Sequence, residues 1–226
     1  MKVSIIIPCL NEEHYVAKLL CDLERQTHND FEVILMDADS IDKTLKVVKP
    51  FRQSLPLTII EHAPKGVANA RNIGADHAVS DWLLFMDADV TVTPNFLTTF
   101  LEAARKHEVD AASSKFTADS HKKLDHFGAW LHFRYMKLFE RTSYPLAPGG
   151  CILIRRDIHH KVSGFDPRVM SEDFDYITRC AAAGASFKFI TDTSFKVSVR
   201  RYEKDGRIRL FLKLMVYEAH RLIYGK

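Results

Sequence analysis

Short apolar runs alternate with amphipathic segments through the first third of the chain. The runs are short and rich in β-branched or aromatic residues, and they predict buried strands at 3–7, 31–36, 57–60 and 82–86. Apolar residues at helical spacing lie between these runs and predict a helix capped by Asn11 and further helices at 41–48 and 67–78. Strands that alternate with helices indicate an α/β fold, with a mostly parallel central sheet and helices on both faces.

The pattern changes after about residue 110. An aromatic-rich helix is expected at 124–139 and, after a break at 145–150, a strand at 151–154. Ser171 is a candidate N-cap of a helix that ends before Gly184, and a short strand follows at 187–190. We therefore expect one domain over residues 1–200, followed by a basic amphipathic helix within 201–226.

Composition narrows the class of protein. The chain has 226 residues, 46% of them hydrophobic and 27% charged, which excludes intrinsic disorder. No apolar run approaches the roughly 18 residues that span a bilayer. The four cysteines form no CxxC pair and no metal-ligand spacing, which is typical of reduced thiols. We expect a cytoplasmic protein.

Positive charge is concentrated at the C-terminal end. Residues 196–226 contain nine Lys/Arg and three acidic residues, whereas the rest of the chain is mildly acidic. This imbalance favours an anionic partner, such as nucleic acid, phospholipid or a diphosphate substrate. Nucleic acid is disfavoured because the tail has few aromatic residues arranged for base stacking.

Polar clusters follow three of the predicted strands, at 8–12, 37–42 and 87–89. In open parallel sheets, ligands bind outside the carboxyl ends of the strands, so these clusters are expected to share one site. Asp87 and Asp89 are two residues apart and can face one ligand. Paired carboxylates suit Mg²⁺ or Mn²⁺, although an Asp-rich turn after a strand is also common.

Other polar residues allow both a functional and a structural interpretation. The segment from Asp37 to Thr44 lacks the Gly and Glu of an EF-hand, so Asp37 either binds a nucleoside or belongs to a helix cap formed by Asp39 or Ser40. Lys65 and Arg71 either neutralise a diphosphate or form ordinary ion pairs. The segment they belong to has neither a dinucleotide-binding fingerprint nor a P-loop.

An acidic pair opens the helix predicted after Ser171. Glu172 and Asp173 either stabilise the helix dipole or include a general base that removes a proton from a hydroxyl. The sequence alone leaves both interpretations open.

Taken together, the order of these clusters resembles glycosyltransferase family 2, the inverting nucleotide-sugar transferases with the GT-A fold. The resemblance extends from residue 3 to residue 184, and a further stretch looks like the tail of short family members. The matching segments are VSIIIPCLNEE (3–13), ILMDADSIDKT (34–44), KGVANARNIGADHA (65–78), DWLLFMDADV (81–90), GGCILIRRD (149–157), SGFDP (163–167), SEDFDYITRCAAAG (171–184) and RRYEKDG (200–206).

The resemblance implies a nucleotide-sugar-binding half at 1–110 and an acceptor-binding half at 111–200. The residues implied to hold the nucleoside and diphosphate are Pro8, Asn11, Glu12, Asp37, Asp39, Lys65, Arg71, Arg200 and Arg201. Asp37, helped by Asp39, would recognise the base.

The resemblance also implies the reacting groups. Asp87 and Asp89 would form the DxD pair that holds Mn²⁺ or Mg²⁺, with Asp89 as the direct ligand. Gly149 and Gly150 would form an acceptor-side turn, where the missing side chains let substrate approach the backbone. Asp173 would be the catalytic base, supported by Glu172, and the metal with Arg71 would neutralise the departing diphosphate.

The sequence departs from the family pattern at three points. Ala38 replaces the second acid of a DD pair, which leaves the choice between uracil and guanine open. The stretch from Phe195 to Arg200 contains no metal-binding histidine. The processive QxxRW motif is missing, which favours transfer of a single sugar.

The implied partners are a UDP- or GDP-sugar and a hydroxyl acceptor, either lipid-linked or a precursor of a cell-envelope glycan. The basic tail and segment 122–141 would contact an anionic membrane at its inner face, or else pack on the body or on a partner in a homodimer. The alternatives in other classes are a nucleotidyltransferase acting on sugar phosphates and a non-catalytic membrane-surface module.

Overall fold

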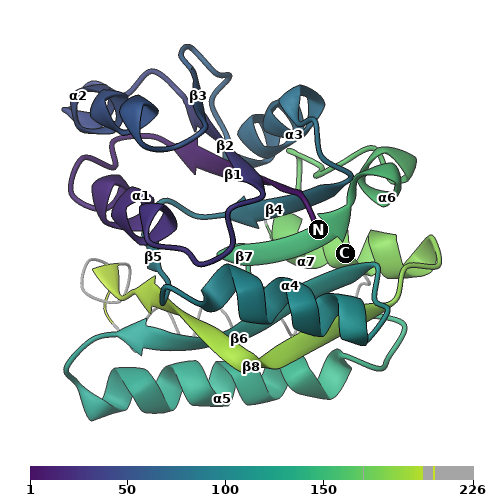
Figure 1. Ribbon diagram of the computed structural model, residues 1–226. Coiled ribbons are helices and arrows are strands. Elements are labelled where there is room, and N and C mark those ends of the chain that lie inside the picture. The colour runs from purple at the N-terminus through teal and green to yellow at the C-terminus, as the bar shows by residue number, and fades with distance from the viewer. Residues whose placement is uncertain (170, 201–205, 207–226) are drawn as a thin grey trace.

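The computed structural model describes residues 1–169, 171–200 and 206. In this part of the chain one mixed sheet of eight strands runs in the order β3-β2-β1-β4-β7-β6-β8-β5 (Figure 1). The strands are β1 (Val3–Cys9), β2 (Phe31–Asp37), β3 (Leu57–Ile60), β4 (Trp82–Met86), β5 (Val90–Thr91), β6 (Ala111–Asp119), β7 (Cys151–Arg155) and β8 (Phe187–Ser198).

The sheet is parallel through β3, β2, β1 and β4, and again between β6 and β8. Strand β7 is antiparallel to both of its neighbours, and β5 is antiparallel to β8. The predicted α/β class with a mostly parallel sheet is therefore confirmed, with antiparallel pairing confined to β7 and the short β5.

Helices cover both faces of this sheet (Figure 1). They are α1 (Val16–Glu24), α2 (Thr44–Val48), the 3₁₀ helix η1 (Lys49–Gln53), α3 (Val67–His77), α4 (Phe96–Lys106), α5 (Lys123–Phe139), α6 (Arg156–Lys161) and α7 (Glu172–Ala182).

Strand β1 explains why two cores form. Side chains alternate between the faces of a strand, so Ile5 and Ile7 belong to the core that also contains buried residues of α1, α4 and α5, whereas Ile6 belongs to the core that contains buried residues of α3 and α7. All three side chains are fully buried. A strand that is apolar on both sides fits only in the centre of a sheet that is covered on both faces.

The predicted helix cap at Asn11 is wrong. Asn11 has a left-handed φ of 57°, and α1 begins only at Val16, after Tyr15. Hydrogen bonds to the distant segment 40–44 hold the loop instead. The Asn11 amide donates to Ser40 Oγ and the Ile41 amide donates to Asn11 Oδ1, both at 2.9 Å.

The other predicted elements differ from expectation mainly in length, whereas η1, β5, α4, β6 and α6 are not among the predicted elements. Helix α2 begins at Thr44, three residues later than expected, and β8 extends the strand expected at 187–190 to Ser198. Ser171 is the N-cap residue of α7, although its side chain makes no capping hydrogen bond.

Helix α5 packs on the body through one face only. Its buried residues include Ala129, Phe133 and Met136, and the Phe133 ring packs edge-on against Phe116 of β6 and Phe189 of β8. The helix predicted within 201–226, including Arg201, lies outside the described residues. Among the described residues, no helix has both the length and the apolar character required to cross a membrane.

Candidate active site

A cavity of about 530 Å³, called here the main cavity, lies at the carboxyl ends of β1 and β4. Its walls contain many of the residues singled out from the sequence. These are Pro8, Glu12, Arg71, Asp87, Asp89, Gly149, Gly150, Glu172, Asp173 and Arg200. Asn11, Asp37, Asp39 and Lys65 do not line it.

Strand register explains why residues so far apart in sequence meet here. Strand β4 ends at Met86, so Asp87 is the first residue beyond the sheet edge. Met86 pairs with Cys151, the first residue of the antiparallel strand β7. Gly149 and Gly150 therefore reach the same edge as Asp87 from the opposite chain direction.

Arg71 of α3 organises the inner wall of the main cavity. Its side chain is 2% exposed. Nη2 donates to Asp87 Oδ1 at 2.8 Å and to the Gly149 carbonyl at 3.1 Å, and Nη1 donates to Glu172 Oε1 at 3.3 Å. The guanidinium thus joins the segment after β4, the turn before β7 and the start of α7. The ion pairs left open by the sequence are present, and both partners line the cavity.

Asp173 is held by backbone donors on both carboxylate oxygens. Oδ2 accepts from the Gly149 amide at 2.8 Å, and Oδ1 accepts from the Phe174 amide at 3.0 Å. The pKa of Asp173 is raised to about 6, mainly by burial and in addition by the neighbouring Glu172 charge, while Arg71 and the two amides act in the opposite direction. A carboxyl group with this pKa is suited to general-base chemistry near neutral pH.

The neighbours of Gly149 leave no room for a side chain at this position. A Cβ at this position would lie 2.7 Å from Arg71 Nη2 and 3.2 Å from Asp173 Oδ2, so any larger residue would push these two groups apart. At Gly150 a Cβ would lie 3.0 Å from the Phe195 ring. At Gly149 the missing side chain leaves room for Arg71 and Asp173.

Arg200 connects the last strand to the loop after β1. Its guanidinium forms two bonds to the Glu12 carboxylate, at 2.6 and 2.5 Å, and its Nε lies 3.1 Å from Asp89 Oδ2. It also lies over the Tyr15 ring, 5.0 Å from the centroid. The hydrogen bonds to Glu12, with the charge of Asp89, raise the pKa of Arg200. No local pattern in the chain indicates this link between residues 188 positions apart.

The segment after β2 lies beside the main cavity, and only Ala38 lines it. Asp37 is 1% exposed, and its Oδ2 accepts from the Ser40 amide at 3.1 Å. Its Oδ1 is buried and has no hydrogen-bond partner among the described residues. Asp39 is turned toward His62, whose Nδ1 lies 2.6 Å from Asp39 Oδ1, and this contact raises the pKa of His62.

His132 of α5 also lines the main cavity, and no motif pointed to it. Its ring packs edge-on against Phe116, with centroids 5.7 Å apart. Residues of this kind are placed by packing on the sheet rather than by a local pattern, so only the structure reveals them.

The carboxylates of Asp87 and Asp89 fit a divalent cation whose remaining ligands come from the substrate. Within the described residues, no group of three or more His, Cys, Asp or Glu side chains gathers as a ready metal site. Asp87 and Asp89 both line the main cavity. Mg²⁺ is commonly held by one or two carboxylates together with substrate phosphates, and the Asp87–Asp89 pair matches this mode.

The comparisons with known proteins identify the class. A model of glycosyl transferase family 2 matches residues 4–163, so the chain belongs to glycosyltransferase family 2. Membership in this family argues against the nucleotidyltransferase alternative. The fold is the GT-A fold of these enzymes.

Individual relatives are similar to part of this chain. A PGL/p-HBAD biosynthesis glycosyltransferase of Mycobacterium bovis is 42% identical over 88 residues, 38% of this chain and 34% of that protein. TarS of Staphylococcus aureus, a poly(ribitol-phosphate) β-N-acetylglucosaminyltransferase, is 32% identical over 114 residues, 49% of this chain and 20% of that protein. The matches thus span about a third and a fifth of these relatives.

Two solved structures share the fold. The mannosyltransferase PcManGT of Pyrobaculum calidifontis, in complex with GDP-Man and Mn²⁺, has a TM-score of 0.73 at 21% identity and covers 95% of this chain and 64% of its own. TarS residues 1–349 with UDP have a TM-score of 0.72 at 23% identity, over 88% of this chain and 61% of that one. At these identities the likeness shows the fold alone.

Proposed function

We propose that the chain is a metal-dependent, inverting glycosyltransferase that moves one sugar from a UDP- or GDP-sugar to a hydroxyl acceptor. The observation that carries the proposal is one cavity that holds a carboxylate pair, Asp87 and Asp89, and a separate, partly buried carboxyl, Asp173, whose pKa is about 6. The nucleotide sugars bound by the structural neighbours support a nucleotide-sugar donor.

The donor diphosphate would lie beside Asp87 and Asp89, with Asp89 as the direct ligand of Mn²⁺ or Mg²⁺. A bound cation would neutralise negative charge on the departing diphosphate. Arg200 already contacts Asp89 and provides a second positive charge at this edge. Arg71 is committed to Asp87, Glu172 and Gly149, so its proposed contribution is to position the carboxylates and to supply a fixed positive field.

The nucleoside would lie over the ends of β1 and β2. Pro8, Ala38 and Glu12 line this part of the main cavity. The unpartnered Asp37 Oδ1 suits an N–H donor of the base, since an unsatisfied buried acceptor is costly. Asn11 shapes the loop, while Asp39 and Lys65 would act at the rim. Residues 1–110 supply this donor half, and residues 111–200 supply the acceptor half.

Asp173 would take the proton from the acceptor hydroxyl as that oxygen attacks the anomeric carbon. Each carboxylate oxygen accepts one backbone N–H, which leaves a further lone pair for the incoming hydroxyl. Attack opposite the departing diphosphate inverts the anomeric configuration. Glu172 binds Arg71 and thereby holds the start of α7 in place.

The acceptor is proposed to be a lipid-linked or cell-envelope glycan precursor, presented at an anionic membrane surface. Helix α5 exposes Leu124, Phe127 and Trp130, at 65%, 58% and 51%, and the last two rings stack on each other. Basic residues at 122, 123, 134 and 141 accompany these side chains. An apolar face with basic neighbours is complementary to anionic lipid. Flotation with anionic liposomes at low salt tests this, and failure to float would refute the membrane contact.

A donor screen tests the proposed function. UDP-, GDP- and dTDP-sugars are added with Mn²⁺, and the melting temperature is recorded. A donor at one hundred times its dissociation constant should stabilise the protein by about 2.7 kcal/mol. Metal-dependent hydrolysis of that donor would distinguish an enzyme from a non-catalytic module. Lack of stabilisation by every nucleotide sugar would refute the proposal.

A further inference from the structure

The segment 162–165, which follows α6, is bound to both α3 and α7 and has no role in the reaction as proposed above. Asn72 of α3 holds its last residue. Asn72 Nδ2 donates to the Phe165 carbonyl and the Phe165 amide donates to Asn72 Oδ1, both at 2.8 Å. Arg179 Nη2 of α7 donates to the Gly164 carbonyl, also at 2.8 Å. Two helices therefore fix the backbone of this segment.

The contact between this segment and α3 leaves no room for a side chain at position 164. Gly164 has a left-handed φ of 67°, which favours glycine. A Cβ there would lie 2.3 Å from Asn72 Oδ1 and 3.1 Å from His159 Nε2. The glycine of the SGFDP stretch (163–167) is thus explained by the close approach of Asn72.

The ring of Phe165 contacts a cation on α3 and an aromatic ring on α7. Its side chain is 1% exposed. The Arg71 guanidinium carbon lies over the ring, 5.0 Å from the centroid, and the Tyr176 ring stacks on it with centroids 3.9 Å apart. Tyr176 is fully buried, and its hydroxyl lies 2.8 Å from His159 Nδ1. Phe165 therefore cannot leave Arg71 without breaking contacts to both helices.

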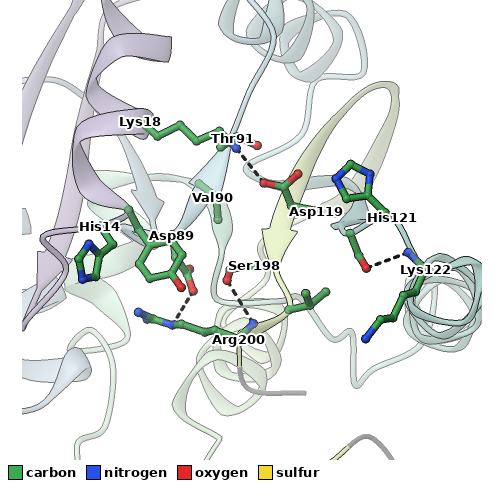
Figure 2. Close-up of a pocket in the computed structure, with 13 residues that line it drawn as sticks. His14, Lys18, Asp89, Val90, Thr91, Asp119, His121, Lys122, Ser198 and Arg200 are labelled. Atoms are coloured by element: carbon green, nitrogen blue, oxygen red, sulfur yellow. Dashed lines mark hydrogen bonds and ion pairs between the residues drawn. The ribbon is translucent and has the colours of Figure 1, made fainter. Parts of the chain in front are cut away.

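Arg71 is the kind of cation that needs such a neighbour. Its side chain is 2% exposed, and its Nε has no hydrogen-bond partner among the described residues. By contrast, the side chain of Arg200, which contacts Asp89 and also lines the main cavity, is 34% exposed (Figure 2). A buried guanidinium lacks the hydration that an exposed one keeps, so the electron-rich face of an aromatic ring stabilises it.

We propose that Phe165, fixed by Asn72, is a positioning residue that sets where the Arg71 guanidinium lies in the wall of the main cavity. The proposal rests on the function proposed above, because the ring would affect the reaction only through Arg71. That guanidinium donates to Asp87 and Glu172. Its charge also lowers the pKa of Asp173, so a guanidinium that moves away should let this pKa rise.

Carbon-13 NMR titration of the aspartate carboxyl groups, in the free protein, tests the proposal. Phe165→Leu keeps an apolar side chain and removes the aromatic face, so the pKa of Asp173 should rise by about 0.5 unit. Asp173→Asn assigns the signal, because that carboxyl group is then missing. Phe100→Leu is the matched control, since Phe100 is a fully buried ring of α4 in the other core. It should lower the urea midpoint to a similar degree and leave the pKa of Asp173 unchanged.

Three results would overturn the proposal. One is an unchanged pKa of Asp173 in Phe165→Leu, and another is an equal rise in Phe100→Leu. The third is a fall of this pKa in Phe165→Leu. A fall would mean that water reaches Asp173 because α7 has loosened, so that Phe165 supports the helix and does not position Arg71.

Asn72→Ala gives a second test that leaves the ring in the chain. It removes both bonds that fix Phe165, so the pKa of Asp173 should rise, by less than in Phe165→Leu. Adding Asn72→Ala to Phe165→Leu should cause no further rise, because Asn72 acts through the ring. Asn69→Ala is the control on the same helix, since Asn69 donates to the Lys65 carbonyl at 3.1 Å. Additive rises in the double variant, or a rise in Asn69→Ala, would contradict the proposal.

A pH–rate profile of Phe165→Leu connects the site to turnover. The acidic limb should move to higher pH by the same amount as the pKa of Asp173, so kcat should fall about twofold more at pH 6 than at pH 8. A pKa that rises while the limb stays in place would count against Asp173 as the base, and hence against the proposed function. An unmoved pKa in the free protein would refute the role of Phe165 alone, so the two failures are distinguishable.

Discussion

Replacing Asp173 by Asn should change how the stability of the protein depends on pH. The pKa of Asp173 is about 6, against an ordinary value of 3.8, and burial is the main cause. A difference of about two units corresponds to about 3 kcal/mol between the two protonation states. This free energy is a cost of carrying the charged carboxylate inside the folded cavity.

The raised pKa of Asp173 determines whether this carboxyl makes the fold more or less stable as pH rises. The folded protein binds a proton at Asp173 more tightly than the unfolded chain does, so this carboxyl stabilises the fold fully below pH 3.8 and loses that contribution as pH rises through 6. Asn does not titrate. Between pH 3.5 and pH 8 the unmodified protein should therefore lose about 3 kcal/mol of unfolding free energy relative to Asp173→Asn.

Urea unfolding of both proteins at several pH values measures this difference. The Asn amide cannot accept the Phe174 N–H while it keeps the bond from Gly149, so the variant also carries a constant cost of about 1 kcal/mol. The test therefore uses the change with pH and not the absolute values. Asp76→Asn, at an exposed position of α3, should shift stability by less than about 0.5 kcal/mol at each pH. Parallel pH curves for the unmodified protein and Asp173→Asn would refute the reasoning.

Three further predictions concern the wall of the main cavity. Gly149→Ala should lower the free energy of unfolding by about 1–3 kcal/mol and abolish most of the turnover, because the added Cβ meets Arg71 and Asp173. Gly128→Ala on α5 is the control, because open space surrounds that position. It should raise the free energy of unfolding by about 1 kcal/mol and leave turnover unchanged. Arg71→Met should lower the free energy of unfolding in urea by about 3 kcal/mol. It should also shift the acidic limb of the pH–rate profile to higher pH, because the Arg71 charge lowers the pKa of Asp173. An acidic limb at unchanged pH would contradict this. Arg200→Gln should weaken donor binding about tenfold by calorimetry. Unchanged affinity would show that Arg200 serves only its contacts within the protein, to Glu12, Asp89 and Tyr15.

The elements that sequence analysis located are those in which the local pattern and the fold agree. Strands β1, β2 and β4 are nearly continuous apolar runs, so composition alone identifies them. Strand β6 was missed because its sequence, AASSKFTAD, has no strong apolar pattern. Its Ser113 and Ser114 are fully buried because pairing with β7 and β8 satisfies them, and that pairing is not local information.

The site residues also fall into those that a local pattern predicts and those that depend on distant contacts. Asp87, Asp89 and the Glu172–Asp173 pair follow directly from where a strand ends and a helix begins, and the structure brings them to one cavity. The burial of Arg71 depends on partners 16 and 101 residues away, and the bond between Arg200 and Glu12 spans 188 residues. No local pattern encodes such contacts, so the sequence suggested these arginines only as diphosphate contacts.

The most direct test of the central claim compares turnover and donor binding in Asp173→Asn. With the stabilising nucleotide sugar, Mn²⁺ and a hydroxyl acceptor, the account predicts that kcat falls by about 10²-fold or more, because the proton acceptor is lost. The donor dissociation constant should stay within about twofold, because the carboxylates at 87 and 89 are untouched. Near-normal turnover, or loss of donor binding together with activity, would contradict the assignment of Asp173 as the base.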